Sequence, residues 1–129
     1  ALGAARQRTV KWRVELMNVA SEKVGATWIM RLQENRLDAH NARAFKSKIV
    51  ECVENGEDRI ALDMSQVEFI DSSGLGAIVS SLKAMGGGRS LSIFGLNPPT
   101  MSMFKLTRMD RVLSLYANQD EALAGEEAA

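Results

Sequence analysis

Val67-Glu-Phe-Ile-Asp-Ser-Ser-Gly-Leu-Gly-Ala-Ile78 is the most informative stretch of this chain. Its apolar first half predicts a buried strand, and the polar and glycine residues that follow predict a tight turn into a helix. Asp71, Ser72 and Ser73 all favour the cap region of a helix. A regular apolar stripe follows at helical spacing, so we expect the turn to present two hydroxyls at a helix N-terminus.

A hydroxyl in the first turn of a helix has a distinctive electrostatic position. It lies beside backbone N–H groups that have no partner within the helix, at the positive end of the helix macrodipole. Gly74 and Gly76 let other groups approach the backbone closely at this point. A phosphate here would be stabilised rather than repelled. The sequence therefore predicts a site that can carry a phosphoserine without unfolding.

The composition is that of an ordinary globular domain, with 129 residues, of which 46% are hydrophobic and 25% are charged. Lys and Arg together number 16, as do Asp and Glu, and this balance argues against a general nucleic-acid binder. No apolar run approaches the roughly 20 residues of a membrane helix, and no signal-peptide pattern is seen. We therefore expect one cytoplasmic domain at 10–125, between a loose tail or expression remnant at 1–9 and a C-terminal tail at 126–129.

The apolar runs and turn residues predict strands and helices that alternate after an opening antiparallel hairpin. Strands are expected at residues 12–20, 26–32, 59–64, 90–94 and 112–116, with the hairpin turn at 21–25. Helices are expected after the caps Asp38, Ser72–Ser73, Asn97 and Asn118, and the first two end at Asn55-Gly56 and Gly86-Gly87-Gly88. Short connections imply one α/β domain, with a mixed, mainly parallel sheet of four to five strands and helices packed on it.

The sequence lacks the residues needed for three kinds of site: a serine nucleophile, a nucleotide-binding loop and a metal site. A nucleophilic serine needs a base, but the sole histidine, His40, follows a predicted helix cap, and no Ser-centred G-x-S-x-G elbow is present. The triple glycine at 86–88 ends a helix and lacks the Lys-Ser/Thr of a nucleotide-binding loop. Asp38, Asp63 and Asp71 all suit caps and strand ends, so we expect no metal site, no cofactor and no catalytic residue.

The sulfur-containing residues have plain structural interpretations. Cys52 is the only cysteine, which excludes an internal disulfide and is typical of a reducing compartment. Within its amphipathic helix we expect it to be a small packed hydrophobe and not a nucleophile. The methionines at positions 64, 85, 101, 103 and 109 fit gaps in a core. The segment 101–109 also fits an adaptable contact surface, and both alternatives stay open.

The run Asp63-Met-Ser-Gln-Val-Glu-Phe-Ile-Asp-Ser-Ser-Gly-Leu-Gly76 closely resembles the signature of the STAS domain, in the form found in bacterial anti-sigma factor antagonists. Leu37-Asp38 followed by a helix resembles a second element of that family, Gly-x-Leu-Asp. The later glycine-rich turn, strand and proline-containing helix also fall where such proteins have them. The resemblance covers residues 11–124 and implies a STAS-type fold for that region.

The resemblance implies a protein–protein switch and no enzyme activity. Such antagonists bind an anti-sigma factor when they are unphosphorylated, and the anti-sigma factor is typically also the serine kinase that ends the complex. A serine phosphatase of the PP2C type resets the switch. The hydroxyl that the family modifies falls here on Ser73, with Ser72 as a second candidate. The implied partner-binding residues are Asp38, Asp71, Ser72, Ser73, Gly74 and Leu75.

Two points qualify this interpretation. Where the family often has Gly-Glu-Leu-Asp, this chain has Asn35-Arg36-Leu37-Asp38, which alters the loop that faces the partner. The same domain type also occurs as a scaffold in stress-signalling assemblies and as a soluble subunit of ABC-type transport systems, including those for lipids. A non-switching scaffold or transport subunit is therefore the alternative interpretation, and it needs no reversible phosphate.

Overall fold

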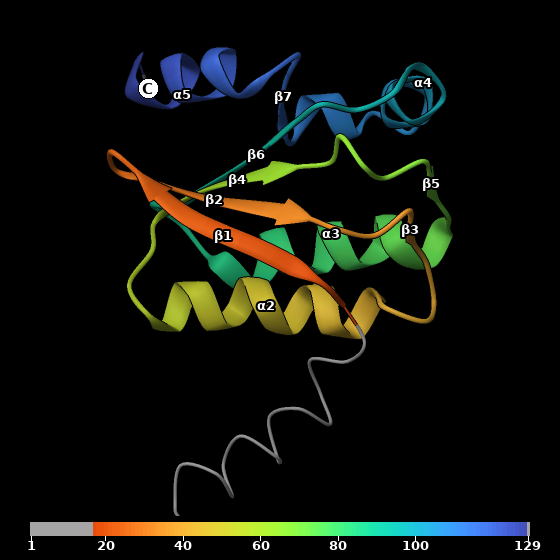
Figure 1. Ribbon diagram of the computed structural model, residues 1–129, viewed down its shortest axis with the longest axis horizontal. Helices are drawn as coiled ribbons and strands as arrows, with labels where there is room; N and C mark the ends of the chain where they lie inside the picture. Colours follow the sequence, from red (N-terminus) through yellow and green to blue (C-terminus); the bar gives the residue numbers. More distant parts are fainter. Residues whose placement is uncertain (1–16, 129) are drawn as a thin grey trace, which may run out of the picture.

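Five strands form the main sheet of the computed structural model, which describes residues 17–128 (Figure 1). The strand order is β1-β2-β4-β6-β7. β1 (Val19–Val24) pairs antiparallel with β2 (Thr27–Leu32). From β2 onward the sheet continues in parallel through β4 (Arg59–Asp63), β6 (Ser90–Phe94) and β7 (Ser114–Tyr116). The prediction of a mixed, mainly parallel sheet after an antiparallel hairpin is confirmed.

Helices lie on both sides of this sheet (Figure 1). α2 (Ala42–Glu54) and α3 (Ser72–Met85) pack against each other on one face. α5 (Gln119–Ala128) lies on the opposite side. α4 (Pro98–Leu106) and the short 3-10 helix η1 (Met109–Arg111) contribute Phe104 and Met109 to the core cluster that α2 and α3 share. Within residues 17–128, no helix is both long and apolar enough to span a bilayer. The predicted α/β architecture, with helices packed on the sheet, is therefore confirmed.

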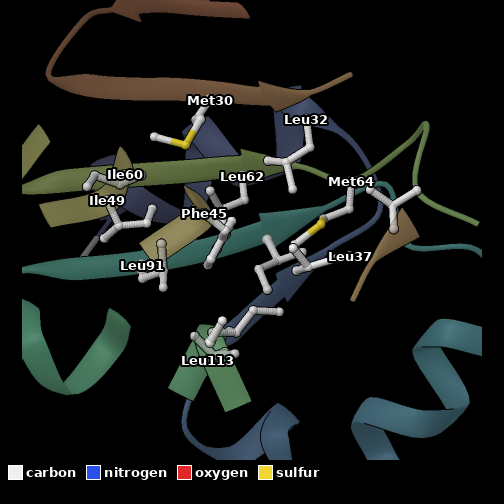
Figure 2. Close-up of a cluster of buried hydrophobic side chains, with 14 of the residues drawn as sticks. Met30, Leu32, Leu37, Phe45, Ile49, Ile60, Leu62, Met64, Leu91 and Leu113 are labelled. Atoms are coloured by element: carbon white, nitrogen blue, oxygen red, sulfur yellow. The ribbon is translucent and has the colours of Figure 1, made fainter. Parts of the chain in front are cut away.

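Side chains alternate along the strands, and this alternation divides the core into two clusters. In β2, Met30 joins the larger cluster with α2 and α3, while its neighbour Ile29 joins the smaller one beneath α5. Members of the larger cluster shown in Figure 2 are Met30, Leu32, Leu37, Phe45, Ile49, Ile60, Leu62, Met64, Leu91 and Leu113. The smaller cluster contains Ile29, Ala61, Phe94 and Ala122. Both faces of the sheet are therefore covered, as a mainly parallel sheet requires.

The first strand is shifted from its predicted position. The prediction placed it at 12–20 and a turn at 21–25, whereas β1 runs from Val19 to Val24 and the turn occupies Gly25 and Ala26. Residues 12–16 lie outside the described part of the chain, as does the predicted tail at 1–9. The prediction was wrong because β1 is an edge strand whose residues 21–23 are exposed, so it lacks an apolar alternation.

A second, two-stranded parallel sheet lies at the end of the domain where α3 begins. In it, β3 (Arg36–Leu37) pairs with β5 (Phe69–Ile70). The sequence predicts a buried strand before Asp71, but only the two residues of β5 are in strand conformation, and they lie outside the main sheet. The chain leaves the main sheet after Asp63 and turns, with the N–H of Val67 donating to the carbonyl of Met64 at 3.0 Å.

Several helix ends are where the sequence predicts them. Asn55 is the C-cap of α2, and Gly86, with φ +76°, is the C-cap of α3. At the start of α4, the side-chain oxygen of Asn97 accepts the N–H of Thr100 at 2.9 Å. At the start of α5, Asn118 accepts the N–H of Glu121 at 2.9 Å in the same way. Local capping chemistry is therefore sufficient to place these boundaries.

The C-terminal third departs from the predicted boundaries in small ways. β7 begins at Ser114 and not at 112, because Val112 and Leu113 form the turn that ends η1, and their N–H groups donate to the carbonyl of Met109 at 3.1 and 3.0 Å. α5 continues to Ala128, beyond the boundary predicted at 125, and position 129 lies outside the described residues. Of the methionines in question, those at 64, 85 and 109 are buried, and those at 101 and 103 are half-buried.

Candidate functional site

Asp71 is the N-cap of α3. Its Oδ1 accepts the N–H of Gly74 at 2.9 Å, and its carbonyl accepts the N–H of Leu75 at 2.9 Å. Ser72 and Ser73 therefore occupy the first two positions of the helix, and both are exposed. Because the carboxylate already caps the helix, neither serine hydroxyl is needed for capping, and neither has a hydrogen-bond partner within the described residues.

The helix start is a favourable place for negative charge. α3 has 14 residues, long enough for an aligned backbone dipole, and no acidic residue lies within its first turn. The first backbone N–H groups of a helix have no intrahelical acceptor, and Asp71 satisfies only that of Gly74. The exposed hydroxyls of Ser72 and Ser73 thus lie beside free donors that can stabilise an anion.

Strand β3 packs directly against this helix start. The N–H of Asp71 donates to the carbonyl of Leu37 at 3.2 Å. A Cβ at Gly74 would lie 2.2 Å from the same carbonyl oxygen, so only glycine fits this close contact. Leu37 itself is fully buried. The loop that begins at Leu37 is therefore fixed beside the two serines, and Asp38, its next residue, is brought to the same end of the domain.

Asp38 does not cap a helix, contrary to the prediction. Its Oδ1 accepts the N–H of His40 at 3.0 Å, and its own N–H donates to Oδ1 of Asn41 at 2.9 Å. Asn41 is the N-cap residue of α2, which begins at Ala42. The prediction was wrong because an Asp that accepts a backbone N–H two residues later forms an Asx turn, which has the same sequence preference as a cap.

Arg36 and Phe69 form a pair that the sequence does not single out. They lie opposite each other in the β3–β5 ladder, and Cζ of Arg36 stands 4.8 Å from the centroid of the Phe69 ring. The Arg36 Nε also lies 3.4 Å from Oδ2 of Asp38. Phe69 is 45% exposed, although it is a large hydrophobic residue. In the sequence, the one feature that could have pointed to this pair is the departure from the family pattern at Asn35-Arg36.

The remaining candidates do not converge on this site. His40 is 96% exposed, and its Nδ1 lies 3.6 Å from Asp38, with no serine hydroxyl bonded to either. Asp63 accepts the N–H of Ser65 at 2.9 Å and pairs with Arg31 at 3.3 Å. Across residues 17–128, no three His, Cys, Asp or Glu side chains are grouped so that they could hold a metal ion.

Cys52 is buried in α2, as predicted. Burial raises the pKa of its thiol to about 11 from the usual 9.0, and the negative charges of Glu51 and Glu57 act in the same direction. The thiolate that a nucleophile would need is therefore suppressed at neutral pH. Cys52 is a packed apolar residue and takes no part in the site.

The chain is similar to known proteins over most of its length. The family model described as "STAS domain" matches residues 18–122. A putative anti-sigma factor antagonist of Thermotoga maritima is 31% identical over 97 residues, which cover 74% of this chain and 86% of the relative.

Solved structures agree with this sequence similarity. The crystal structure of a putative anti-sigma factor antagonist from Thermotoga maritima superposes with a TM-score of 0.75 at 30% identity, covering 83% of this chain and 92% of that one. The phosphorylated form of the Bacillus cell fate determinant SpoIIAA superposes with a TM-score of 0.63 at 21% identity, covering 83% and 97%. The second match supports the fold alone.

Proposed function

This chain belongs to the STAS domain family, with relatives named anti-sigma factor antagonists, and we propose that it is a reversible binding switch of that kind. In the unphosphorylated state it binds an anti-sigma factor that is also a serine kinase. Phosphorylation of Ser73 ends the complex. The observation that carries the proposal is the pair of exposed hydroxyls at the start of α3, which are free because Asp71 caps the helix in their place.

Ser73 is the proposed phosphorylation site, and Ser72 is the second candidate. Both side chains are exposed, so a kinase can reach either. The preference for Ser73 comes from the position of the modified residue in the STAS pattern. The proposed partner surface surrounds it and comprises Asp38, Asp71, Ser72, Ser73, Gly74 and Leu75. Within this set Gly74 is buried and acts by letting Leu37 approach, whereas the serines supply the accessible surface.

The phosphate is proposed to act on the interface and not on the fold. It adds about −1.5 to −2 charge and three strong acceptors at a place where free backbone donors tolerate it. A partner that covers the unmodified helix start would meet the added bulk, the cost of desolvating a phosphate, and repulsion from its own carboxylates. A penalty of about 2.8 kcal/mol is enough to weaken binding a hundredfold.

The rest of the proposal follows from this role. A PP2C-type phosphatase removes the phosphate and returns the chain to its binding state. We propose that the chain acts in the cytoplasm as a binding protein and not as an enzyme. Within residues 17–128 the one histidine, His40, lies beside Asp38 and is not bonded to a serine hydroxyl. No cofactor or nucleic acid takes part.

The test is a pull-down from native lysate with wild type, Ser73→Ala and Ser73→Asp as baits, followed by mass spectrometry. Ser72→Ala serves as the matched control for loss of an adjacent hydroxyl. We expect a kinase-like anti-sigma factor with wild type, with Ser73→Ala and with Ser72→Ala, and its loss with Ser73→Asp. Recovery of the same scaffold or ABC-transporter proteins by all four baits would overturn the switch and favour the non-switching alternative.

A further inference from the structure

We propose that Arg36 and Phe69 form the anchor that selects the partner, and that the partner presents a carboxylate to Arg36 beside an apolar surface that covers Phe69. This inference rests on the proposed function, because it names the chemistry of the anti-sigma factor surface that would meet the start of α3. It concerns residues of β3 and β5, which lie outside the serine-containing turn (Figure 1).

The first argument is exposure at the right end of the molecule. Three large hydrophobic residues of the described chain are exposed, namely Phe69, Leu106 and Val112. Leu106 ends α4 and Val112 follows η1, whereas Phe69 stands only four residues before Ser73. Its neighbour Ile70 is 3% exposed, so the alternation of β5 turns Phe69 outward. Exposed aromatic side chains are enriched at the centres of protein interfaces.

The second argument is that the Arg36 guanidinium is held in place. It stacks on the ring of Phe69 at 4.8 Å and its Nε lies 3.4 Å from Asp38, yet its side chain stays 63% exposed. The Nη groups therefore remain available to a ligand, and little rotamer freedom is left to lose on binding. A planar guanidinium that is already oriented matches a carboxylate with two parallel hydrogen bonds.

The third argument is charge. The segments 34–41 and 67–76 contribute β3, β5 and the start of α3 to this end of the domain, and Arg36 is the one Lys or Arg within them. The acidic residues of the two segments are Glu34, Asp38, Glu68 and Asp71. Arg36 is therefore the one position in these two segments where a partner carboxylate would meet a cation. A partner that is cationic throughout would leave this guanidinium buried against like charge.

The anchor also gives the switch a specific physical basis. Leu37, the residue after Arg36, contacts both Asp71 and Gly74, so the anchor and the serines belong to one rigid surface. A partner carboxylate bound to Arg36 would be repelled by a phosphate on Ser73. The same phosphate competes with that carboxylate for the guanidinium, because phosphate and carboxylate are both ligands that arginine prefers.

The test uses the anti-sigma factor recovered in the pull-down and measures its dissociation constant by calorimetry. The variants are Arg36→Glu, Arg36→Gln, Phe69→Ala and Phe69→Leu, where the second of each pair is the milder change in case the first fails to fold. The matched controls are Arg108→Glu and Leu106→Ala, an exposed arginine and an exposed leucine near α4 and η1. We expect at least hundredfold weaker binding with Arg36→Glu, at least tenfold with Phe69→Ala, smaller losses with the milder variants, and changes within twofold for the controls.

A charge exchange tests the partner's chemistry directly. Each acidic residue on the partner's surface is changed to lysine in turn, and one of these variants should restore binding to Arg36→Glu by at least tenfold. A merely structural role for Arg36 would give no such rescue. Failure of every exchange overturns the assignment of a carboxylate.

The other outcomes separate this inference from the proposed function. If Ser73→Asp abolishes binding while the Arg36 and Phe69 variants bind within twofold of wild type, the switch stands and the anchor is overturned. If wild type captures no anti-sigma factor, the proposed function is overturned and the anchor with it.

Discussion

The carbonyl oxygen of Leu37 occupies the space that a side chain at Gly74 would need. A Cβ at position 74 would stand 2.2 Å from this oxygen, 2.8 Å from the carbonyl carbon and 3.0 Å from Cγ2 of Ile70. Gly74 has no positive φ, so its role is steric and not conformational. The glycine allows β3 to lie against the start of α3, and it thereby holds Asp38 and the serines at one end of the domain.

We expect Gly74→Ala to lower the free energy of unfolding by about 3 kcal/mol, because the methyl group meets backbone that cannot rotate away. Denaturant unfolding measures this value. Gly76→Ala is the matched control, since nothing lies within 4 Å of a Cβ at that position. In the control, replacing glycine inside a helix should raise stability by about 0.5–1 kcal/mol. Equal effects of the two substitutions would contradict the steric role of Gly74.

The capping role of Asp71 gives a second prediction. Asp71→Ala removes the acceptor for the N–H of Gly74 and should cost about 1 kcal/mol, whereas Asp71→Asn keeps an acceptor and should cost less. Thermal unfolding measures the difference. Ser72→Ala and Ser73→Ala should leave the melting temperature nearly unchanged, because neither hydroxyl caps the helix. A larger loss from a serine variant than from Asp71→Ala would show that the cap is assigned to the wrong residue.

Local signals in the sequence were enough for the parts of the fold that local chemistry fixes. The apolar runs predict β4 and β6, and side chains such as Asn97 predict a helix start because their cap hydrogen bonds span only three residues. The preference of Asp and Asn for helix caps also led to a wrong start for α2, because Asp38 forms an Asx turn and does not cap the helix. Which of three adjacent cap-forming residues caps α3 also required the structure, because Asp71, Ser72 and Ser73 have similar preferences.

Pairings between distant segments could not be predicted. β3 and β5 are two residues each, too short for any periodicity, and they pair across more than 30 positions of the chain. The stacking of Arg36 on Phe69 depends on that pairing, so the proposed anchor was invisible in the sequence. β1 was misplaced for a related reason. Its register is set by pairing of Val24 with Thr27 across the turn, and its exposed residues carry no apolar pattern.

The raised pKa of Cys52 predicts a loss of stability at alkaline pH. The folded protein holds the thiol proton more tightly than the unfolded chain does, because the folded-state pKa is about 11 and the usual value is 9.0. This contribution to the free energy of unfolding is complete below pH 9 and is lost as the pH rises toward 11. The loss attributable to this thiol should approach about 2–3 kcal/mol. The difference between wild type and Cys52→Ala isolates it, because lysine and tyrosine titrate equally in both. Parallel stability curves for the two proteins from pH 8 to 11 would contradict the shift.

The same shift predicts slow alkylation. At pH 8 a thiol whose pKa is raised by about two units has roughly a hundredfold less thiolate, so iodoacetamide should label Cys52 about a hundred times more slowly in the folded protein than in urea. Mass spectrometry of timed samples gives both rates. Rapid labelling of the folded protein would mean that α2 opens locally or that the thiol is ionised.

A final prediction separates an interface switch from a folding switch. Ser73→Asp places a carboxylate at the N-terminus of α3, where the macrodipole contributes about 0.3–1 kcal/mol of stabilisation, and Coulomb repulsion from the carboxylate of Asp71, two residues earlier, opposes it. Both effects are about 1 kcal/mol or less, so the melting temperature should stay within about 4 °C of wild type. Ala84→Asp is the matched control, because it places the same charge at the exposed C-terminal end of the same helix. At that end the helix dipole disfavours a negative charge, and Asp has a lower helix propensity than Ala. Ala84→Asp should therefore lower the free energy of unfolding by about 1 kcal/mol. A collapse of the Ser73→Asp fold, detected by circular dichroism, would place the effect of phosphorylation on folding and not on the binding surface.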